Sequence, residues 1–187
     1  MKVKIDKLNK EYLNEVTALV LNTYKEEISS VPFLPFEDDF KEMYRKQIKK
    51  LISEGTGIVA KLNNKIVGFL AGYRVEEFWG KAKGIYCPDY GHGVIKKNKK
   101  KIYQKLYKNA AKLWVNKGYT HHALTIYAHD KKAINTFFWL GFGLRCIDAM
   151  RKTAVIGNIN PDISIKKIGI DNIADLAEIQ RELHEYF

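Results

Sequence analysis

Five lysines gather at the start of a predicted helix, where side chains of this type could hold a phosphorylated ligand. They are Lys96, Lys97, Lys99, Lys100 and Lys101, and a helical pattern follows directly after them. A helix N-terminus carries unpaired backbone N–H groups and the positive end of the helix dipole, so it attracts anions. The sequence therefore favours a phosphate-binding role for this cluster about as strongly as it favours an inert basic loop.

The composition describes a basic chain that is long enough for one domain plus an appendage. Of the 187 residues, 46% are hydrophobic, and no run approaches the roughly 18 apolar residues of a membrane span. The N-terminus lacks the apolar region of a signal peptide, so we expect a soluble, cytoplasmic protein. The net charge of +11 favours binding to nucleic acid, a membrane surface or a phosphorylated cofactor. Lysines spread from residue 2 to residue 167 are, however, also typical of a solvated surface.

Neither a metal site nor a disulfide framework is predicted. Cys87 and Cys146 have no CxxC partner, and the pair His121-His122 has no further ligand at metal spacing. Two reduced thiols are the interpretation that suits a cytoplasmic protein.

Strand and helix patterns alternate along the chain. Strands are expected at 2–8, in a hairpin at 55–62 and 65–79, irregularly at 84–95, at 124–128 and at 142–150. Helices are expected after the capping residue Asn9, from Phe40 to Leu51, from about Ile102 to Asn116, and from Ala133 to Leu140. This order predicts an α/β (α+β) fold, a mixed sheet with helices on its faces.

Two features of this pattern have more than one interpretation. Residues 31–40 (VPFLPFEDDF) favour an ordered loop that either walls a pocket or uses Phe33, Leu34 and Phe36 to plug the edge of the core. Gly68 and Gly72 weaken their strand unless backbone or ligand must approach closely there.

The end of the chain resembles its beginning. With a shift of 160 residues, VKIDKLNKEYLNEVTAL lies over ISIKKIGIDNIADLAEI, so that Val3 meets Ile163 and Leu13 meets Ile173. Both segments show a strand, a turn and an amphipathic helix. We predict a domain at 1–157, followed at 158–187 by the first two elements of a second, truncated unit.

Two sets of positions in the central stretch form a recognisable motif. The first set, at the start of a predicted helix, is Asn98, Lys101 and Tyr103. The second set lies at the end of the stretch and consists of Asp130, Ala133, Ile134, Phe137, Gly141 and Phe142. At these positions the chain resembles the GCN5-related N-acetyltransferase (GNAT) family. The family's acyl-coenzyme A loop, an Arg or Gln followed by xxGxG or xxGxA, falls on the first set. The family's closing signature, an Asn, Ala-Ile three and four residues later, a Tyr at seven, and Gly-Phe at eleven and twelve, falls on the second.

This resemblance, over about residues 1–155, implies a mostly antiparallel central sheet with helices on both faces and acetyl-CoA as the acyl-donor co-substrate, with no metal. The tail looks like the opening of a second GNAT unit, as in tandem proteins of the family. The resemblance places cofactor contacts at Val94, Ile95, Asn98, Lys99, Lys100, Lys101, Ile102, Tyr103, Asp130, Ala133 and Phe137.

The catalytic residues follow from the same resemblance. Acyl transfer to an amine needs a base for the ammonium and an acid for the leaving thiolate. Phe137 stands where many members have an acidic tyrosine, which predicts a slower reaction, and Tyr127 or Tyr103 is the nearest substitute. His92, between Gly91 and Gly93, is the first candidate base, with bonding to a bulged backbone as its alternative role. Further candidate bases are His129, Glu76 and Glu77.

The expected function is transfer of an acetyl group from acetyl-CoA to a primary amine of a small molecule or peptide. The alternative is a catalytically weakened GNAT-like module that binds CoA or regulates a second unit. No specific nucleic acid or membrane partner is expected, because the aromatics interleaved with the lysines fit a helical core pattern. A homodimer, or packing with a second GNAT unit, is compatible with the sequence.

Overall fold

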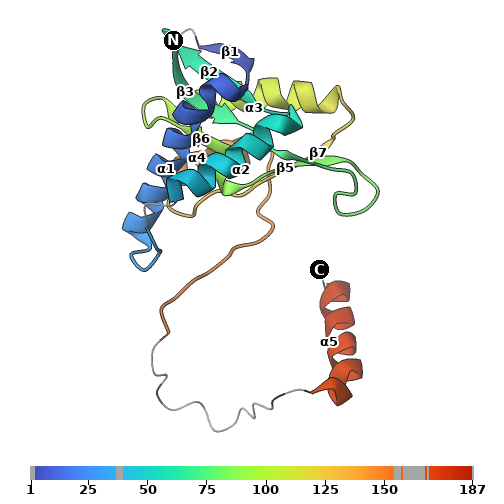
Figure 1. Ribbon diagram of the computed structural model, residues 1–187. Coiled ribbons are helices and arrows are strands. Elements are labelled where there is room, and N and C mark those ends of the chain that lie inside the picture. Colours follow the sequence, from blue (N-terminus) through green and yellow to red (C-terminus); the bar gives the residue numbers. More distant parts are fainter. Residues whose placement is uncertain (1–2, 37–39, 154–156, 158–166, 168, 187) are drawn as a thin grey trace. The chain divides into compact units, whose positions relative to one another are not determined.

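The computed structural model describes residues 3–36, 40–153, 157, 167 and 169–186. The chain divides into two compact units, residues 1–149 and 150–187, and the first contains the whole sheet (Figure 1). The predicted boundary between residues 157 and 158 stays a prediction.

The helices and strands follow the predicted order. The strands are β1 (Lys4–Lys7), β2 (Ile58–Leu62), β3 (Lys65–Leu70), β4 (Tyr73–Val75), β5 (Gly84–Cys87), β6 (His92–Val94) and β7 (His121–Leu124). The α-helices are α1 (Leu13–Ser30), α2 (Phe40–Glu54), α3 (Lys99–Val115), α4 (Lys131–Trp139) and α5 (Ile173–Tyr186). Three short 3-10 helices are η1 (Lys10–Tyr12), η2 (Asp89–Gly91) and η3 (Ile170–Asn172).

The sheet is mixed and mostly antiparallel, as predicted. One part has the order β1-β2-β3-β6 and the other the order β4-β5-β7, and only the pair β5–β7 is parallel among the described strands. The two parts are continuous along the chain, because β3 leads into β4 and β5 leads through η2 into β6. The amide of Ala71, between β3 and β4, donates to the carbonyl of Gly91, at the end of η2, at 2.7 Å. This bond joins the two parts of the sheet at the bend between them.

Glycine makes this bend compatible with close packing. A Cβ added to Gly91 would lie 2.5 Å from the carbonyl oxygen of Ala71, and one added to Gly72 would lie 2.5 Å from Ile85. A Cβ on Gly68 would meet Val94 at 2.8 Å. The glycines in this hairpin therefore serve close approach of backbone and side chains, one of the interpretations that the sequence allowed.

Helices cover both faces of the sheet, as the fold class requires (Figure 1). On one face, Val16 of α1 and Ile48 of α2 pack with Val59 and Phe69 of the sheet. On the other face, Leu106 and Trp114 of α3 and Phe137 of α4 pack with side chains such as Leu70 and Ile85. The alternation of side chains along each strand thus feeds two separate cores.

Two strand predictions were wrong in position or existence. The expected strand at 124–128 lies instead at His121–Leu124, because its parallel partner β5 ends at Cys87 and the chain then turns at Pro88. Residues 142–150 form no strand, and their side chains are largely exposed. Apolar alternation there covers only Phe142, Leu144 and Cys146 before Ile147 breaks it, and a strand needs a longer match with a neighbour.

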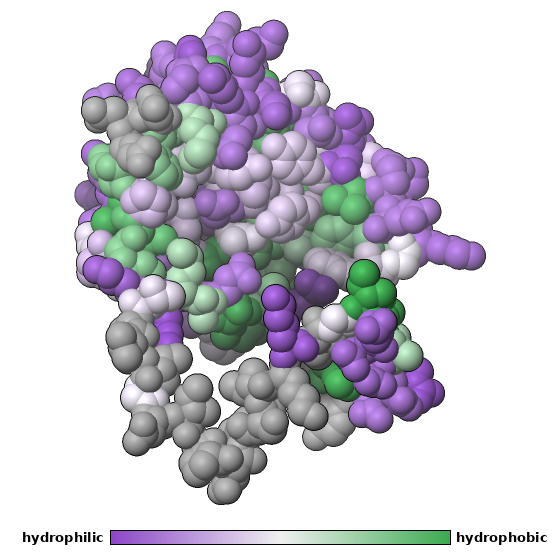
Figure 2. All heavy atoms as spheres, turned by 60° about the horizontal axis from the view of Figure 1, so that its bottom comes forward, coloured by the Kyte–Doolittle hydropathy of each residue, from purple (hydrophilic) through white to green (hydrophobic). Residues whose placement is uncertain are grey.

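The second unit repeats the local structure that begins the first. η3 and α5 follow each other as η1 and α1 do, at the 160-residue offset found in the sequence. The apolar side chains of α5 are exposed, however, with Ile173 at 58%, Leu176 at 43% and Ile179 at 53%. Hydrophobic groups accordingly show as patches on a largely hydrophilic surface (Figure 2). The predicted strand before α5 lies mostly outside the described residues.

Candidate functional site

β6 and the chain after β7 are not paired with each other. β7 pairs with β5 up to Leu124, and the amide of Thr125 still donates to the carbonyl of Cys87 at 2.9 Å. Beyond this point η2 interrupts the neighbouring strand, and no backbone hydrogen bond joins β6 to residues 125–129 in the described part of the chain.

The edge of β6 that faces away from β3 carries backbone groups with no backbone partner among the described residues. Bonds from Ile95 to Val67 and from Ala71 to Gly91 fix the alternation of the β3–β6 ladder, so Gly93 pairs with β3. His92 and Val94 stand at the non-bonded positions, and their amide and carbonyl groups point away from β3. An extended ligand that carries amide groups could pair with this edge as an added strand does.

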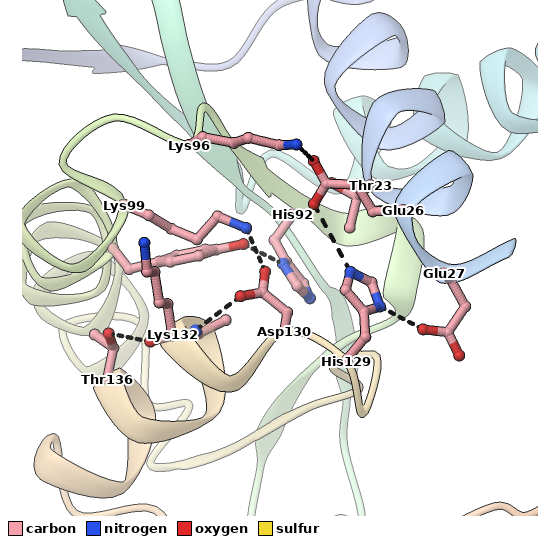
Figure 3. A network of polar contacts seen from close by, with 12 residues as sticks. Thr23, Glu26, Glu27, His92, Lys96, Lys99, His129, Asp130, Lys132 and Thr136 are labelled. Carbon is pink, nitrogen blue, oxygen red and sulfur yellow. Dashed lines mark hydrogen bonds and ion pairs between the residues drawn. The ribbon is translucent and has the colours of Figure 1, made fainter. Parts of the chain in front are cut away.

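Two hydrogen bonds tie His92 to α3 and to the chain after β7, and Figure 3 draws one of them. Its Nε2 lies 2.8 Å from the carbonyl oxygen of Thr125, and its Nδ1 lies 2.9 Å from the hydroxyl oxygen of Tyr103. Because a carbonyl can only accept, Nε2 carries the proton and Nδ1 accepts from the Tyr103 hydroxyl. Burial lowers the pKa of His92, so the ring is a neutral structural bridge, matching the backbone-bonding role considered for it.

Lys99 and Asp130 form a buried ion pair between the starts of α3 and α4. The Lys99 Nζ and Asp130 Oδ2 atoms are 2.5 Å apart, and the two side chains are 7% and 6% exposed. Asp130 also caps α4, because its Oδ1 accepts from the amide of Ala133 at 3.0 Å. Lys99 therefore points inward, and its ammonium group holds α4 in place beside α3.

The start of α3 still presents positive charge and backbone donors. The amides of Lys99, Lys100 and Lys101 belong to the first turn and have no partner within the helix. Asn98 precedes them in a left-handed conformation with φ of 59°. The side chains of Lys100 and Lys101 are exposed, and the next residue, Ile102, is buried. An anion at this helix end would therefore meet amides and ammonium groups together.

Tyr103 does not cover this helix end. Its ring is 1% exposed and packs against Phe137 of α4, with ring centroids 5.4 Å apart. Burial raises the pKa of the Tyr103 phenol, and its hydroxyl is already bound to His92. The two aromatic residues at the signature positions therefore form core.

A second histidine, His129, stands between two carboxylates of α1 (Figure 3). Its Nδ1 is hydrogen-bonded to the Glu27 carboxylate, and its Nε2 lies 3.7 Å from Oε2 of Glu26. Nε2 is buried and has no hydrogen-bond partner among the described residues. Because a carboxylate accepts, the contact with Glu27 requires a proton on Nδ1, and Nε2 faces Glu26. Lys96 pairs with Glu26 at 3.1 Å and completes this cluster.

A third polar group, Asp89, lies on the bend of the sheet within aromatic surroundings. The Tyr127 hydroxyl donates to Oδ2 of Asp89 at 2.6 Å, and burial together with this negative charge raises the pKa of Tyr127. The ring of Tyr127 stacks with that of His129, with centroids 6.0 Å apart. Tyr24 and Tyr44 pack beside it, and burial raises the pKa of Tyr44 to about 12. The structure thus links Asp89, Tyr127 and His129.

Glu76 lies elsewhere, at the end of the β4–β5 hairpin. Its carboxylate pairs with Lys83 at 2.6 Å and accepts from the Tyr119 hydroxyl at 3.1 Å, and these bonds lower its pKa. Glu76 is separated from His92 by the remaining length of the hairpin, and Glu77 beside it is exposed. The structure therefore does not bring Glu76 together with the other predicted site residues.

Three carboxylates near these groups, Asp89, Glu26 and Glu27, were not predicted from the sequence. Asp89 had a signal, because a carboxylate inside an irregular strand marked by Pro88 and Gly91 fits a bulge, and bulges are frequent at active sites. Glu26 and Glu27 had none, since two glutamates late in an amphipathic helix are typical of a solvated face. Only the fold brings them to His129.

Among the described residues, no group of three His, Cys, Asp or Glu side chains is arranged to hold a metal ion. None of the helices in that part of the chain is long and apolar enough to cross a membrane.

Neither a protein-family model nor a curated protein sequence matches this chain. Solved structures do match. The aminoglycoside N-acetyltransferase AAC(6')-Iy in complex with CoA is 14% identical with a TM-score of 0.60, over 82% of this chain and 96% of that one. Ribosomal-protein-alanine N-acetyltransferase from Brucella melitensis biovar Abortus 2308 is 13% identical with a TM-score of 0.57, over 81% and 100%.

An aminoglycoside acetyltransferase from an uncultured soil metagenomic sample, in complex with sisomicin, is 19% identical with a TM-score of 0.54, over 82% of this chain and 97% of that one. All three likenesses cover about four-fifths of this chain. The protein has the fold of the GNAT acetyltransferases, as the closing signature and the order of elements predicted.

Proposed function

We propose that the protein is an N-acyltransferase that moves an acetyl group from acetyl-CoA to a primary amine of a small molecule or peptide by direct transfer. The observation that carries this proposal is the free strand edge of His92 and Val94, which leads from the lysine-rich start of α3 to the bend of the sheet. CoA bound to a protein of the same fold supports it. Cys87 and Cys146 are free thiols, which suits the cytoplasm.

The donor would lie along this edge. Bound there, acetyl-CoA supplies a thioester whose carbonyl carbon accepts the amine. Its phosphates would meet the first-turn amides of α3 and the side chains of Lys97, Lys100 and Lys101. Its amide-bearing arm would pair with the backbone of His92 and Val94. The phosphates of the donor would have access to the start of α3, because the Tyr103 ring is confined to the core and leaves this helix end uncovered.

The remaining predicted donor contacts are core or ladder residues next to this edge. Ile102, Ala133 and Phe137 are buried in the same core cluster as Val94, and Ile95 continues the β3–β6 ladder through its bond to Val67. Asp130 caps α4 and binds Lys99, so it orients the two helix starts. These residues shape the donor site and do not react.

The acceptor must lose a proton before its nitrogen can attack the carbonyl carbon. We assign His129 as the proton acceptor, because Nε2 has no hydrogen-bond partner among the described residues and Glu27 orients the ring through Nδ1. Glu26, at 3.7 Å from Nε2, would stabilise the imidazolium that forms. Asp89, which has one hydrogen-bond partner in the described chain, would attract the ammonium group of the acceptor.

The leaving thiolate then needs a proton. Phe137 has none to give, and the raised pKa values of Tyr103 and Tyr127 make both phenols weak acids. A free thiol has a pKa near about 8.5, so the thiolate can take a proton from water. The reaction therefore proceeds without a dedicated acid, at a lower rate.

A thiol-release assay with acetyl-CoA over a panel of primary amines tests this function. We expect CoA release that depends on the amine, together with a rise in melting temperature on adding acetyl-CoA alone, because ligand binding stabilises the folded state. Replacing Lys97, Lys100 and Lys101 together by glutamine should abolish the rise. Absence of both signals at saturating donor would refute the proposal.

The alternative is a catalytically weakened module that binds CoA and regulates a partner. Phe137 in place of the acidic tyrosine favours it, as do the bonds of His92 and Lys99 across the donor site. A rise in melting temperature without CoA release, unchanged by Phe137→Tyr, would select this alternative.

A further inference from the structure

The solvent-facing side of α3 carries a straight row of lysines. Lys101, Lys105, Lys108 and Lys112 follow one another at intervals of four, three and four residues, which places them on one line of the helix. All four are exposed. Lys105 donates to the carbonyl of Val3, and no ion pair involves the row in the described part of the chain. The row therefore presents uncompensated positive charge.

The sequence on both sides of the row contains no acidic residue over a long stretch. From Tyr90 to His129 the chain contains nine lysines and no aspartate or glutamate. The whole protein has 21 acidic residues, so their absence from this stretch is a segregation of charge and not a general shortage. A basic stripe along one helix is the electrostatic footprint of polyanion binding.

This arrangement costs stability in the free protein. Lysines four residues apart on a helix repel each other by a few tenths of a kcal/mol per pair. The first turn of α3 has no acidic residue to match the helix dipole and carries three lysines instead. An ordinary surface helix has charges of both signs. A bound anionic partner would offset the repulsion between the lysines of this row.

The phosphates of acetyl-CoA cannot account for the whole row. Eleven residues separate Lys101 from Lys112, which corresponds to about 17 Å along the helix axis. A diphosphate at the helix start would contact the first turn only. Lys108 and Lys112 lie two and three turns further on, and the proposed donor site makes no use of them.

We propose that the α3 lysine row (Lys101, Lys105, Lys108 and Lys112) binds the phosphodiester backbone of nucleic acid without reading its sequence. The aromatic residues near the row are unavailable for stacking on bases, because Tyr103 and Trp114 are buried and the Tyr107 hydroxyl is bonded to His122. A membrane surface fits less well. In this fully described helix the apolar side faces the core, and Val115 alone among its large apolar side chains is exposed.

Fluorescence anisotropy with a labelled mixed-sequence DNA duplex tests this proposal. We expect affinity to fall about 100-fold between about 50 and about 200 mM salt, as for roughly four phosphate contacts. Lys108→Gln with Lys112→Gln should weaken binding about tenfold and reduce the salt slope by about two. A scrambled duplex should bind equally well. These lysines lie outside the proposed donor site, so acetyl-CoA binding should be unchanged.

The matched control replaces two exposed lysines of α2, with Lys49→Gln and Lys50→Gln. It lowers the net charge by the same amount and should leave DNA affinity within about twofold. Equal losses in the two double variants would overturn the proposal, because net charge alone would then explain binding. Tighter binding to phosphatidylserine-rich vesicles than to the duplex at the same salt would also overturn it, as would no binding to DNA at low salt.

Discussion

His92 lies on β6 and His129 lies just before α4, and their surroundings differ in kind. His92 has both ring nitrogens engaged, a lowered pKa caused by burial, and only neutral hydrogen-bond partners. His129 has one nitrogen bound to Glu27 and a second nitrogen without a hydrogen bond in the described part of the chain. A polar group whose bonds are all satisfied holds structure, whereas an unbonded nitrogen beside carboxylates suits the proton transfer that we propose for His129.

The largest expected effect is on activity at His129. His129→Gln should lower kcat by about 10²–10⁴-fold, because it removes the only proposed proton acceptor. The unfolding free energy should change by less than about 1 kcal/mol. Steady-state kinetics across pH, with urea unfolding of the same samples, checks both statements. His92→Gln is the matched variant, and a greater loss of kcat there, at equal folded fraction, would reverse the two assignments.

Next comes the buried ion pair beneath the His92 bridge. Lys99→Met should reduce the unfolding free energy by about 3–5 kcal/mol, because Asp130 would remain as an uncompensated buried charge. Combining it with Asp130→Asn should recover most of this loss while keeping the cap of α4. Lys100→Met, at the exposed neighbouring position, should stay within about 0.5 kcal/mol of the parent. If chemical denaturation gives equal unfolding free energies for Lys99→Met and Lys100→Met, the Lys99–Asp130 pair does not stabilise the fold.

A smaller loss is expected when the bridge itself is weakened. Tyr103→Phe leaves Nδ1 of His92 buried without a donor, which should cost about 1–3 kcal/mol of unfolding free energy. Because the phenol is assigned no proton transfer, kcat below the melting temperature should fall by less than about threefold. A large drop in kcat with an altered pH profile would instead identify Tyr103 as the missing acid.

The smallest effect is the pH dependence that His92 adds to stability. Burial lowers its folded pKa below the unfolded value of about 6.5, so the unfolded chain binds more protons in the range between the two values. The unfolding free energy should therefore fall with pH below about 6.5, at up to about 1.4 kcal/mol per pH unit. Burial lowers the pKa of His122 as well, so the slope must be compared between the parent and His92→Gln. Identical slopes would contradict the neutral bridge.

Local sequence signals predicted the elements well, and α1 and α5 show where such signals stop. Both helices begin with a 3-10 turn and carry apolar residues at matching positions. Val16 is fully buried and its counterpart Leu176 is 43% exposed, because among the described residues only α1 has a sheet to cover it within its unit. The failed strand at 142–150 has the same cause, since apolar alternation without a paired neighbour does not make a strand.

The site was predictable in part for a similar reason. The lysines at the start of α3 follow from local pattern and lie where they were expected. Asp130 was predicted only as a donor contact, and its role as the cap of α4 came from the structure. The inward turn of Lys99 toward Asp130 is a contact over 31 residues, and that of His129 with Glu27 is one over 102 residues. No local pattern encodes contacts at such separations. Asp89 was partly predictable, because the irregular strand around it was visible in the sequence but its partner Tyr127 was not.

A crystal structure of the protein with bound CoA is the sharpest test of the proposed donor site. We expect hydrogen bonds between the amide groups of the ligand and the backbone of His92 and Val94, with the phosphates against the first turn of α3. The side-chain bonds of His92 should persist in the complex. A ligand bound elsewhere, or direct backbone pairing of β6 with residues 125–129, would exclude this donor site.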